Sequence, residues 1–496
     1  MKKKITTIHN NEPIPLNKIQ VLSPGEFTQE LGDLLSSKYH LSAYFADLQN
    51  ELLYAVCSDA EKGLLYVLAG KVGSGKFNSL APKFPQTQLF EREIFEETGF
   101  TPMGHPWLKP VRFPMNSKNK IGELPFFKMQ GDELHEVAVG PVHAGVIEPG
   151  HFRFQCHGEK VYHLEISLGY QHRGIEKKLV SGSNKKALHL IETAAGDTTI
   201  GHTSAYAQIV EYLTNNKVSV SDNIVRSVAL ELERCANHVG DIGALAGDAG
   251  FLPTQAFCGR IRGDFLNMTA LLCGNRFGRG LVVPGGVGYQ INDSIIKELS
   301  ARIKRGLKEF LDASKLMFDN PSITERFQSI GKLNLESSIG LGIVGPAARA
   351  AGITRDIRQD FAFGNYRFSS IPVSGHIRGN VYGRAYVRWL EVQVSVKYIL
   401  DQLKKLKNSD KNSEKNDNNE SKLKENSLIV SLVEGWRGQI CHAAITDDEG
   451  NFRKYKIYDP SFYNWFGLAQ ALRNQQISDF PLCNKSFNLS YCGHDL

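Results

Sequence analysis

The stretch ETAAGDTTIGHT (residues 192–203) separates two segments that otherwise have the composition of one buried helix. LHLI precedes it and YAQIV follows shortly after it, and both are apolar enough to pack in a core. Between them the chain is small, polar and broken by Gly196, although glycine inside a helix costs about 1 kcal/mol relative to alanine. Core packing alone does not explain this segment, which indicates a functional origin.

The size and composition of the chain limit what that function can be. A chain of 496 residues is too long for one ordinary core, so we expect at least two domains. With 42% hydrophobic and 22% charged residues, it has the composition of a globular protein. No segment approaches the roughly 18 uncharged apolar residues that a membrane helix needs. The opening MKKKITTIHNNEPIP lacks the apolar region of a secretory signal, so we expect a cytosolic chain that meets a membrane only through partners.

Charge and cysteine usage exclude several classes of function. The net charge is +6, of which the lysine- and asparagine-rich residues 404–427 contribute +2, so we expect no nucleic-acid partner. No two of the eight cysteines form a C-x-x-C pair, which argues against a zinc ribbon, a disulfide scaffold or an iron–sulfur cluster within this chain. The cysteines are Cys57, Cys156, Cys235, Cys258, Cys273, Cys441, Cys483 and Cys492.

The patterning predicts an α+β protein with two domains. Residues 1–125 mix short strands such as LLYVLAG (64–70) with helices and form a small α+β domain, and residues 126–139 are a linker. Residues 140–496 are mainly helical with a small sheet, and 404–427 form a disordered insertion because that composition cannot bury a core. The segments that carry these predictions are the hairpin 140–170, the helices 225–245 and 387–403, and the returning hairpin 427–459.

One segment matches a phosphate-binding motif only in part. GKVGSGKF (70–77) fits G-x-x-x-x-G-K, but Phe77 stands where a P-loop needs a serine or threonine for magnesium. No long helix-forming run follows it. We therefore interpret the segment as a turn between two strands.

Several stretches together resemble a known family. GPVHAGVIEPGHFRF (140–154), YQHRGIEKKL (170–179), ERCANHVGDIGAL (233–245), RDIRQD (355–360) and the ending from DPSFYNWF (459–496), with the opening stretch, resemble the large subunit of membrane-bound, energy-converting nickel–iron hydrogenases. The same fold serves as the quinone-site subunit of respiratory complex I. FEREIFEETGFTPMGHPWLKPVRFP (90–114) resembles the end of the small complex I subunit that some lineages fuse ahead of the large one.

The resemblance explains the opening stretch as the remains of a metal site. Hydrogenases of this family read E-x-x-C-G-x-C-x-x-x-H there and D-P-C-x-x-C near the C-terminus, and the four thiolates hold nickel. Here Glu192, Gly196 and His202 match. The four cysteine positions are taken by other residues. Gly467 occupies the position where the family has a histidine just before a maturation cut. None of the replacements offers a soft thiolate, so the resemblance predicts a degenerate cavity without metal, formed by Ala195, Thr198, His202, Ser461 and Asn464.

Two further sets of residues follow from the resemblance. Of the three groups that bind the quinone head in complex I, only the aspartate has a counterpart, Asp248. The tyrosine position falls near Ala194, and the loop histidine has no clean counterpart. Glu148 matches the glutamate that passes protons beside nickel, and His143 and His151 lie close to it in sequence. We predict a catalytic set of Glu148, His143, His151 and Asp248, against the alternative that each only stabilises a loop or a helix end.

The resemblance implies a subunit of a membrane-associated respiratory oxidoreductase on the cytoplasmic side. Its partners would be an iron–sulfur subunit carrying the cluster and membrane ion-pumping subunits. Quinone or NAD(H) would serve the whole complex, and this chain alone would bind no cofactor and be inactive. It would accept electrons at the metal-free cavity and couple them to proton movement. The alternatives are a quinone-reducing subunit, an active hydrogenase and a non-catalytic docking scaffold. An open cavity lined by Glu148, Ala195, Thr198 and Ser461 favours redox activity, and a filled one favours the scaffold.

Overall fold

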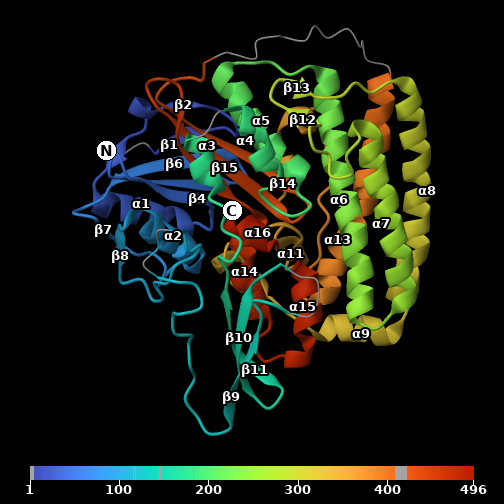
Figure 1. Cartoon of the computed structure of the whole chain (residues 1–496), viewed down its shortest axis with the longest axis horizontal. Coiled ribbons are helices and arrows are strands. Elements are labelled where there is room, and N and C mark those ends of the chain that lie inside the picture. The colour runs from blue at the N-terminus through green and yellow to red at the C-terminus, as the bar shows by residue number, and fades with distance from the viewer. Residues whose placement is uncertain (1–4, 116, 118, 144–147, 182–183, 408–421) are drawn as a thin grey trace.

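The computed structural model describes residues 5–115, 117, 119–143, 148–181, 184–407 and 422–496. Figure 1 shows a sheet and two helices from the N-terminal part on one side, a bundle of long helices on the other, and a sheet from the C-terminal part between them. A narrow three-stranded sheet projects below. None of the described helices is both long and apolar enough to cross a membrane.

A five-stranded sheet forms the core of the N-terminal part. Its order is β1-β6-β5-β4, with β3 parallel to β6 and the other pairs antiparallel. The predicted strand at 64–70 is β6, and the apparent phosphate motif is the turn between β6 and β7, as predicted. The elements are β1 (Thr6–Ile8), β3 (Val21–Leu22), α1 (Pro24–Ser36), β4 (His40–Asp47), β5 (Leu52–Asp59), β6 (Leu64–Lys71), β7 (Lys76–Asn78), α2 (Gln88–Thr98) and β8 (Thr101–Met103).

The first residues of the chain do not stay with this sheet. β2 (Ile14–Pro15) pairs antiparallel with β14 (Ser427–Gly435) of the central sheet. Close by, the Asn10 side chain accepts a hydrogen bond from the backbone nitrogen of Leu432 (2.8 Å) and donates to its carbonyl oxygen (3.0 Å). A two-residue strand carries no recognisable pattern, so the prediction of 1–125 as one unit missed this exchange.

The predicted linker is partly a strand. β9 (Leu134–Val139) pairs with β10 (His151–His157), which pairs with β11 (Lys160–Ser167), so the predicted hairpin is confirmed and gains a third strand. The linker prediction was wrong for residues 134–139. β9 is half-buried at most, and its LHEVAV sequence has too few apolar residues to stand out from a polar connection.

Four long helices form the bundle, and two of them were predicted. The predicted helices at 225–245 and 387–403 are the middle parts of α6 and α13. α6 packs against both α7 and α13, and α8 packs against α7. The four are α6 (Val220–Asp248), α7 (Leu252–Cys273), α8 (Asp293–Phe318) and α13 (Val381–Lys407).

The central sheet has the order β16-β15-β14-β2, and it confirms the predicted returning hairpin. Every residue of β14 and of β15 (Gly438–Thr446) is buried, because α5 (Thr199–Thr214) covers one face and other parts of the chain cover the second. This burial explains runs that are apolar without alternation. α3 (Ile175–Ser181) packs on β16 (Phe452–Tyr458).

The two ends of the predicted disordered stretch, 404–427, lie in a helix and a strand. α13 continues to Lys407 and β14 begins at Ser427, with Leu423 buried just before it. Residues 408–421 lie outside the described part of the chain. The prediction misplaced both ends of this stretch. Lysines at the end of a helix and a polar residue at the start of a strand cannot be told from a disordered segment by composition.

The remaining elements are short and connect or cover these parts, giving an α+β fold with helices segregated from small sheets. They are β12 (Val282–Val283), β13 (Gly286–Val287), α9 (Pro321–Ser329), α10 (Leu335–Gly340), α11 (Gly345–Ala350), α12 (Ile357–Asp360), α14 (Pro460–Ala471), α15 (Phe480–Phe487), α16 (Tyr491–Asp495) and four 3-10 turns, Leu16–Lys18, Pro85–Thr87, Gly364–Arg367 and Ile477–Asp479.

Candidate functional site

The candidate site is built around the loop of residues 193–198, which joins α4 (Asn184–Glu192) to α5 (Thr199–Thr214). Glu233 of α6 caps α5, because its carboxylate accepts hydrogen bonds from the backbone nitrogens of Ile200 (2.7 Å) and Gly201 (3.2 Å). Burial raises the pKa of Glu233 to about 8, although these backbone donors oppose the shift. The first turn of α5 is therefore held by a buried carboxyl group from a neighbouring helix.

Packing explains one glycine of the opening stretch. A Cβ atom on Gly201 would lie 2.7 Å from the Cδ1 atom of Ile440 in β15, so no side chain fits between α5 and the central sheet. Gly196 is different, since a Cβ there would meet nothing closer than 3.9 Å. Part of the unusual composition thus serves close packing rather than chemistry.

The four positions that take the place of the nickel thiolates are buried and engaged with the protein. Thr198 Oγ1 donates to the Gly196 carbonyl oxygen (3.1 Å) and accepts from Arg437 (3.0 Å). Asn464 forms two hydrogen bonds with the backbone of Val344. The exposed fractions are 4% for Ala195, 1% for Thr198, 0% for Ser461 and 2% for Asn464.

The C-terminal segment fills the space between these positions. Ser490 Oγ accepts from the backbone nitrogen of Gly196 (3.2 Å), and the backbone nitrogen of Ser490 donates to Ser461 Oγ (2.8 Å). A Cβ atom on Gly493 would lie 2.8 Å from both the Ala195 Cβ and the Asp459 Cγ, so α16 is in tight contact with the loop. Within the described part of the chain, the predicted cavity is filled.

This arrangement does not fit nickel. Methyl, hydroxyl and amide groups replace the thiolates that the hydrogenase site needs, and the hydroxyl and amide groups already bond to the protein. We therefore derive no step that passes through a metal at this site.

Residues 169–176 hold the C-terminal segment in place. The Asp495 carboxylate accepts from the backbone nitrogens of Gly169 (2.8 Å) and Gln171 (2.9 Å), and His172 Nδ1 pairs with the Asp495 carbonyl oxygen (2.8 Å). Arg173 donates to the carbonyl oxygens of residues 193, 194 and 492. The YQHRGIEKKL stretch therefore connects the loop of residues 193–198, which we call the former metal loop, to α16.

Glu148 contacts the same segment. Its Oε2 atom accepts from the backbone nitrogen of Tyr491 (3.0 Å), and its carboxylate interacts with the Cys492 thiol. Burial first, and then Glu148, raise the pKa of Cys492 to about 11, so the thiol stays protonated at neutral pH. Ser490 Oγ lies 3.3 Å from the Cys492 sulfur. No motif in the sequence indicates that Cys492 lies beside Glu148.

The other predicted catalytic residues are not gathered around Glu148. Both ring nitrogens of His151 are engaged, with the Gly140 carbonyl oxygen (3.0 Å) and Arg153 (3.3 Å), and burial lowers its pKa. His143 is exposed. Asp248 is exposed at the last residue of α6, and among the described residues no hydrogen bond joins it to Glu148 or His151. Their catalytic roles stay predictions.

His202 belongs to a buried series of hydrogen-bonded side chains, and only some of its members were predicted from the sequence. His202 Nε2 pairs with Asp459 Oδ2 (3.1 Å), its Nδ1 pairs with His442 Nε2 (3.0 Å), and His442 Nδ1 pairs with the Tyr455 hydroxyl (2.9 Å). Burial lowers the pKa of His442 well below its usual value, so its imidazole is neutral. Every bond is satisfied if Tyr455 donates to His442, His442 to His202 and His202 to Asp459. His442 and Tyr455 lie in β15 and β16, where no local motif marks them.

A second buried cluster lies where α6, α13 and β14 meet, and we call it the ionic network. Arg349 pairs with Glu391 (2.7 Å) and Glu434 (2.7 Å), and His238 pairs with Glu391 (2.7 Å). The ionic network consists of Glu231, Arg234, His238, Arg349, Asp356, Arg358, Glu391 and Glu434, all at most 2% exposed.

The ionic network has four carboxylates and three guanidinium groups, and the neighbouring Arg355 adds a fourth positive charge that interacts with Glu434. Burial lowers the pKa of His238. For Asp356, burial acts to raise the pKa, but Arg358 and Arg349 more than offset it and bring it to about 2. For Glu434 burial prevails even beside Arg349, and its pKa is raised. Glu434 is therefore the member best suited to hold a proton.

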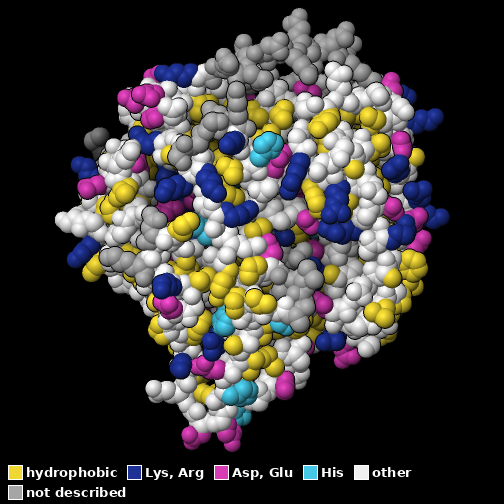
Figure 2. Space-filling model, in the orientation of Figure 1, with side chains coloured by type: hydrophobic (Ala, Val, Ile, Leu, Met, Phe, Trp, Pro, Cys, Tyr) yellow, Lys and Arg dark blue, Asp and Glu magenta, His cyan; other side chains and the backbone are white. Residues whose placement is uncertain are grey.

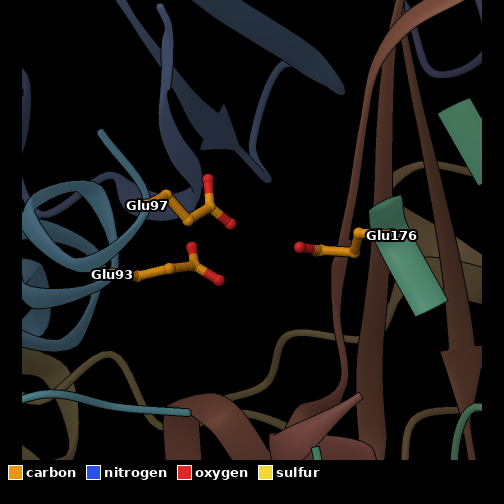
Figure 3. Close-up of side chains that lie close together, drawn as sticks. All are labelled: Glu93, Glu97 and Glu176. Atoms are coloured by element: carbon orange, nitrogen blue, oxygen red, sulfur yellow. The ribbon is translucent and has the colours of Figure 1, made fainter. Parts of the chain in front are cut away.

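A third cluster looks like a metal site but is an ion-pair cluster. Figure 3 shows Glu93 and Glu97 of α2 facing Glu176 of α3, with carboxylate oxygens within 4.8 Å of one another. The Lys456 ammonium lies 2.8, 2.6 and 2.7 Å from Glu93, Glu97 and Glu176. Arg112 pairs with Glu93 and Glu176 as well. The oxygens already bind cationic side chains, so the cluster joins the N-terminal part to the central sheet.

Comparisons with known proteins agree with this architecture. A family model described as "Respiratory-chain NADH dehydrogenase, 49 Kd subunit" matches residues 248–495. Formate hydrogenlyase subunit 5 of Escherichia coli is 26% identical over 446 residues, which cover 84% of this chain and 76% of that protein. An NADH-quinone oxidoreductase subunit of Chloroherpeton thalassium is 27% identical over 380 residues, covering 71% of this chain and 85% of the relative.

A solved structure shares the fold. A chain in the structure of the membrane-bound sulfane sulfur reductase, an archaeal respiratory membrane complex, superposes with a TM-score of 0.68 at 20% identity, covering 73% of this chain and 99% of that one. The resemblance inferred from the sequence motifs is therefore confirmed. The chain belongs to the family of the 49 kDa subunit of respiratory-chain NADH dehydrogenase, together with the large subunits of membrane-bound hydrogenases.

Proposed function

We propose that this subunit couples electron transfer in a neighbouring iron–sulfur subunit to proton movement, and that the ionic network carries the exchangeable proton. The single observation behind the proposal is Glu434, a carboxyl group buried within the network whose pKa burial raises although it pairs with Arg349. Perturbed carboxyl groups in enclosed networks are typical of functional sites. On this proposal the complex lies at the cytoplasmic side of a membrane, together with ion-pumping subunits, and quinone or NAD(H) serves the complex rather than this chain.

A physical connection from the former metal loop to Glu434 supports the proposal. Arg234 donates to the carbonyl oxygens of Glu434 (2.7 Å) and Gly435 (3.0 Å). Two residues further along, Arg437 donates to the Gly196 carbonyl oxygen (2.7 Å). In this proposal, a change of charge or position at the loop of residues 193–198 reaches the ionic network through the turn between β14 and β15.

Glu148 is the second proton-transfer group in the proposal. It lies beside the C-terminal segment, and its partners are the Tyr491 backbone nitrogen and the protonated Cys492 thiol. In this proposal Glu148 passes protons as a positioned carboxyl group.

A docking scaffold is the second candidate function, and the filled cavity favours it. Residues 490–493 occupy the space that a redox-active site would leave open. In a scaffold the ionic network only rigidifies the interior, and electrons and protons pass through other subunits. The filled cavity also argues against electron acceptance at that point in this chain.

The test is Glu434→Gln in the assembled membrane complex. Glutamine keeps an oxygen for Arg349 but cannot release a proton, so the complex should assemble normally. Loss of a proton relay lowers rates by about 10²–10⁴-fold, and we expect electron transfer coupled to proton movement to fall in that range. The measurement is donor-driven electron transfer and proton uptake in membranes, normalised to assembled complex on a native gel.

The matched control is Glu309→Gln, which removes a carboxylate from an exposed ion pair with Arg260. It should change neither rate. Unchanged rates in both variants would reject the coupling role and leave the docking scaffold as the remaining candidate function.

A further inference from the structure

A cavity of about 650 Å³ lies between the N-terminal part and the large domain. It is bounded by α2, by residues 105–113 and 122–127 of the connection, by β11, by α14 and by His494 of α16. Its volume lies within the range of sites that hold small organic molecules. In Figure 2, hydrophobic side chains and histidines are exposed together on the lower half of the molecule, around the β9–β11 sheet that forms one wall.

The wall of the cavity is mainly apolar and aromatic. Trp107, Phe126 and Phe127 come from the connection, and Trp465 and Phe466 come from α14. The rings pack on one another, with centroids 6.2 Å apart for Trp107 and Phe127. Such a surface is unfavourable in contact with water, and an apolar molecule lying against it would remove it from solvent.

The charged groups of the wall are paired, with one exception, and the buried indole nitrogen of Trp465 also lacks an acceptor among the described residues. The Lys109 ammonium is fixed by Glu165 (2.5 Å) and by the Pro125 carbonyl oxygen (2.5 Å), and it lies 4.3 Å from the centre of the Trp107 ring. Three histidines line the wall, His105, His163 and His494, and burial lowers the pKa of each, so they are neutral. The charges of Lys109 and Glu165 cancel.

The exception is Arg92 of α2. Its Nε and Nη2 atoms donate to the carbonyl oxygens of Lys109 (2.7 Å) and Pro110 (2.9 Å), which leaves Nη1 without a protein acceptor among the described residues. No carboxylate of the described chain pairs with it directly. Glu96 and Glu165 act on it only from a distance, and burial lowers its pKa to about 10. One guanidinium nitrogen of Arg92 therefore faces a mainly apolar cavity without an acceptor from the described residues, although Glu96 and Glu165 offset part of the charge.

We infer that this cavity binds a long-chain carboxylate, with the apolar chain against the aromatic wall and the carboxylate on Arg92. A carboxylate would add one negative charge beside Arg92, where Glu96 and Glu165 already act, whereas a phosphate monoester would add nearly two. A guanidinium nitrogen and a carboxylate form a short, charge-assisted hydrogen bond. This ligand site is separate from the ionic network and does not depend on the proposed coupling function.

The experiment measures binding of oleate and of oleyl alcohol to the purified full-length chain, by displacement of an anilinonaphthalene sulfonate reporter. We expect oleate to bind and oleyl alcohol to bind more weakly, because only oleate carries a carboxylate that can pair with the Arg92 guanidinium group. Arg92→Gln should weaken oleate about tenfold to a hundredfold, the effect of one hydrogen bond between charged groups, and leave oleyl alcohol unchanged. Dodecyl phosphate serves to compare a monoester head with the carboxylate.

Two further variants keep the test decisive. Arg153→Gln removes a guanidinium that lies over Phe126 (4.6 Å) but does not line the cavity, and it should leave oleate binding unchanged. Ala469→Trp places a large ring into the cavity from α14 without touching Arg92, and it should abolish binding of both probes. Melting temperatures check that each variant is folded. Absence of oleate binding, equal binding of the alcohol, tighter binding of the phosphate, or an unaffected Ala469→Trp variant would overturn the inference.

Discussion

At the scale of single residues, the four positions that the resemblance assigns to nickel thiolates carry side chains that pack or form hydrogen bonds within the protein. Ala195 is in close contact with Gly493, and Ser461 accepts a hydrogen bond from the backbone nitrogen of Ser490. The C-terminal segment thus holds the loop of residues 193–198 in place.

Glu148 is the residue at which a working site and a scaffold differ most clearly. Glu148→Gln keeps an oxygen to accept from the Tyr491 backbone nitrogen, so complexes should assemble normally. If Glu148 transfers protons as we propose, electron transfer in membranes should fall by about 10²–10⁴-fold. Asp248→Asn should do less, because Asp248 lies apart at the end of α6. Normal rates for Glu148→Gln would restrict this residue to holding the C-terminal segment.

At the scale of elements, α5 connects the site to the sheet. Its N-terminus rests on Glu233 of α6, and its glycine lies against Ile440 of β15. A carboxyl group placed at a helix N-terminus ordinarily favours its ionised form, but burial prevails for Glu233. The helix is therefore held partly by a group that prefers to be neutral.

This conflict predicts an unusual dependence of stability on pH. The folded-state pKa of Glu233 is about 8, above the value of an unfolded glutamate, so the folded state holds the extra proton between roughly pH 4.3 and 8. Its contribution is fully present below that window and declines as the pH rises through it, by up to about 1.4 kcal/mol per pH unit. Glu233→Gln should remove this decline.

The measurement is chemical denaturation of the wild type and of Glu233→Gln at pH 5.5, 7 and 8.5. The difference between the two should shift in favour of the variant as the pH rises. Glu211→Gln is a suitable comparison, because Glu211 is also buried but pairs with Arg226 (2.6 Å). Parallel pH profiles for the wild type and Glu233→Gln would contradict the assignment.

At the scale of the whole molecule, an ion-pair cluster and the exchanged strand β2 join the N-terminal part to the large domain. β2 completes the central sheet, and Lys456 of β16 lies among carboxylates of α2 and α3. These contacts bury charge on both sides of the junction, so the two parts are expected to unfold together. The cavity beside Arg92 lies at the same junction.

Lys456→Met tests that coupling. It removes the buried cation that pairs with the buried Glu93 and with the less buried Glu97 and Glu176, and breaking a buried pair in this way costs about 3–5 kcal/mol. Lys454→Met removes a partner of Glu97 at a more exposed position and should cost no more than about 1 kcal/mol. Adding Glu93→Gln to Lys456→Met should recover part of the loss. Free energies of unfolding measure all three, and a small effect of Lys456→Met would show that the cluster is not required.

The sequence by itself determined the fold class, the family and the absence of thiolates at the former metal site, because these follow from local periodicity and from short contiguous motifs. It also located two of the four long helices, α6 and α13, and the returning hairpin, whose apolar patterns extend over many residues. Isolated acids in apolar runs, Glu391 in VRWLEVQVSV and Glu434 in SLIVSLVEGW, were a usable sign of the ionic network that the patterns alone did not interpret.

Only the tertiary structure decided how these pieces combine. Glu148 meets Cys492, His202 meets His442, and Arg92 faces an apolar cavity through contacts between residues far apart in the chain. The strand at 134–139 and the β2–β14 pair are likewise stabilised by partners rather than by their own composition. Whether the space between Ala195 and Ser461 is open or filled depends on where α16 packs, and packing between distant segments leaves no periodic trace in the sequence.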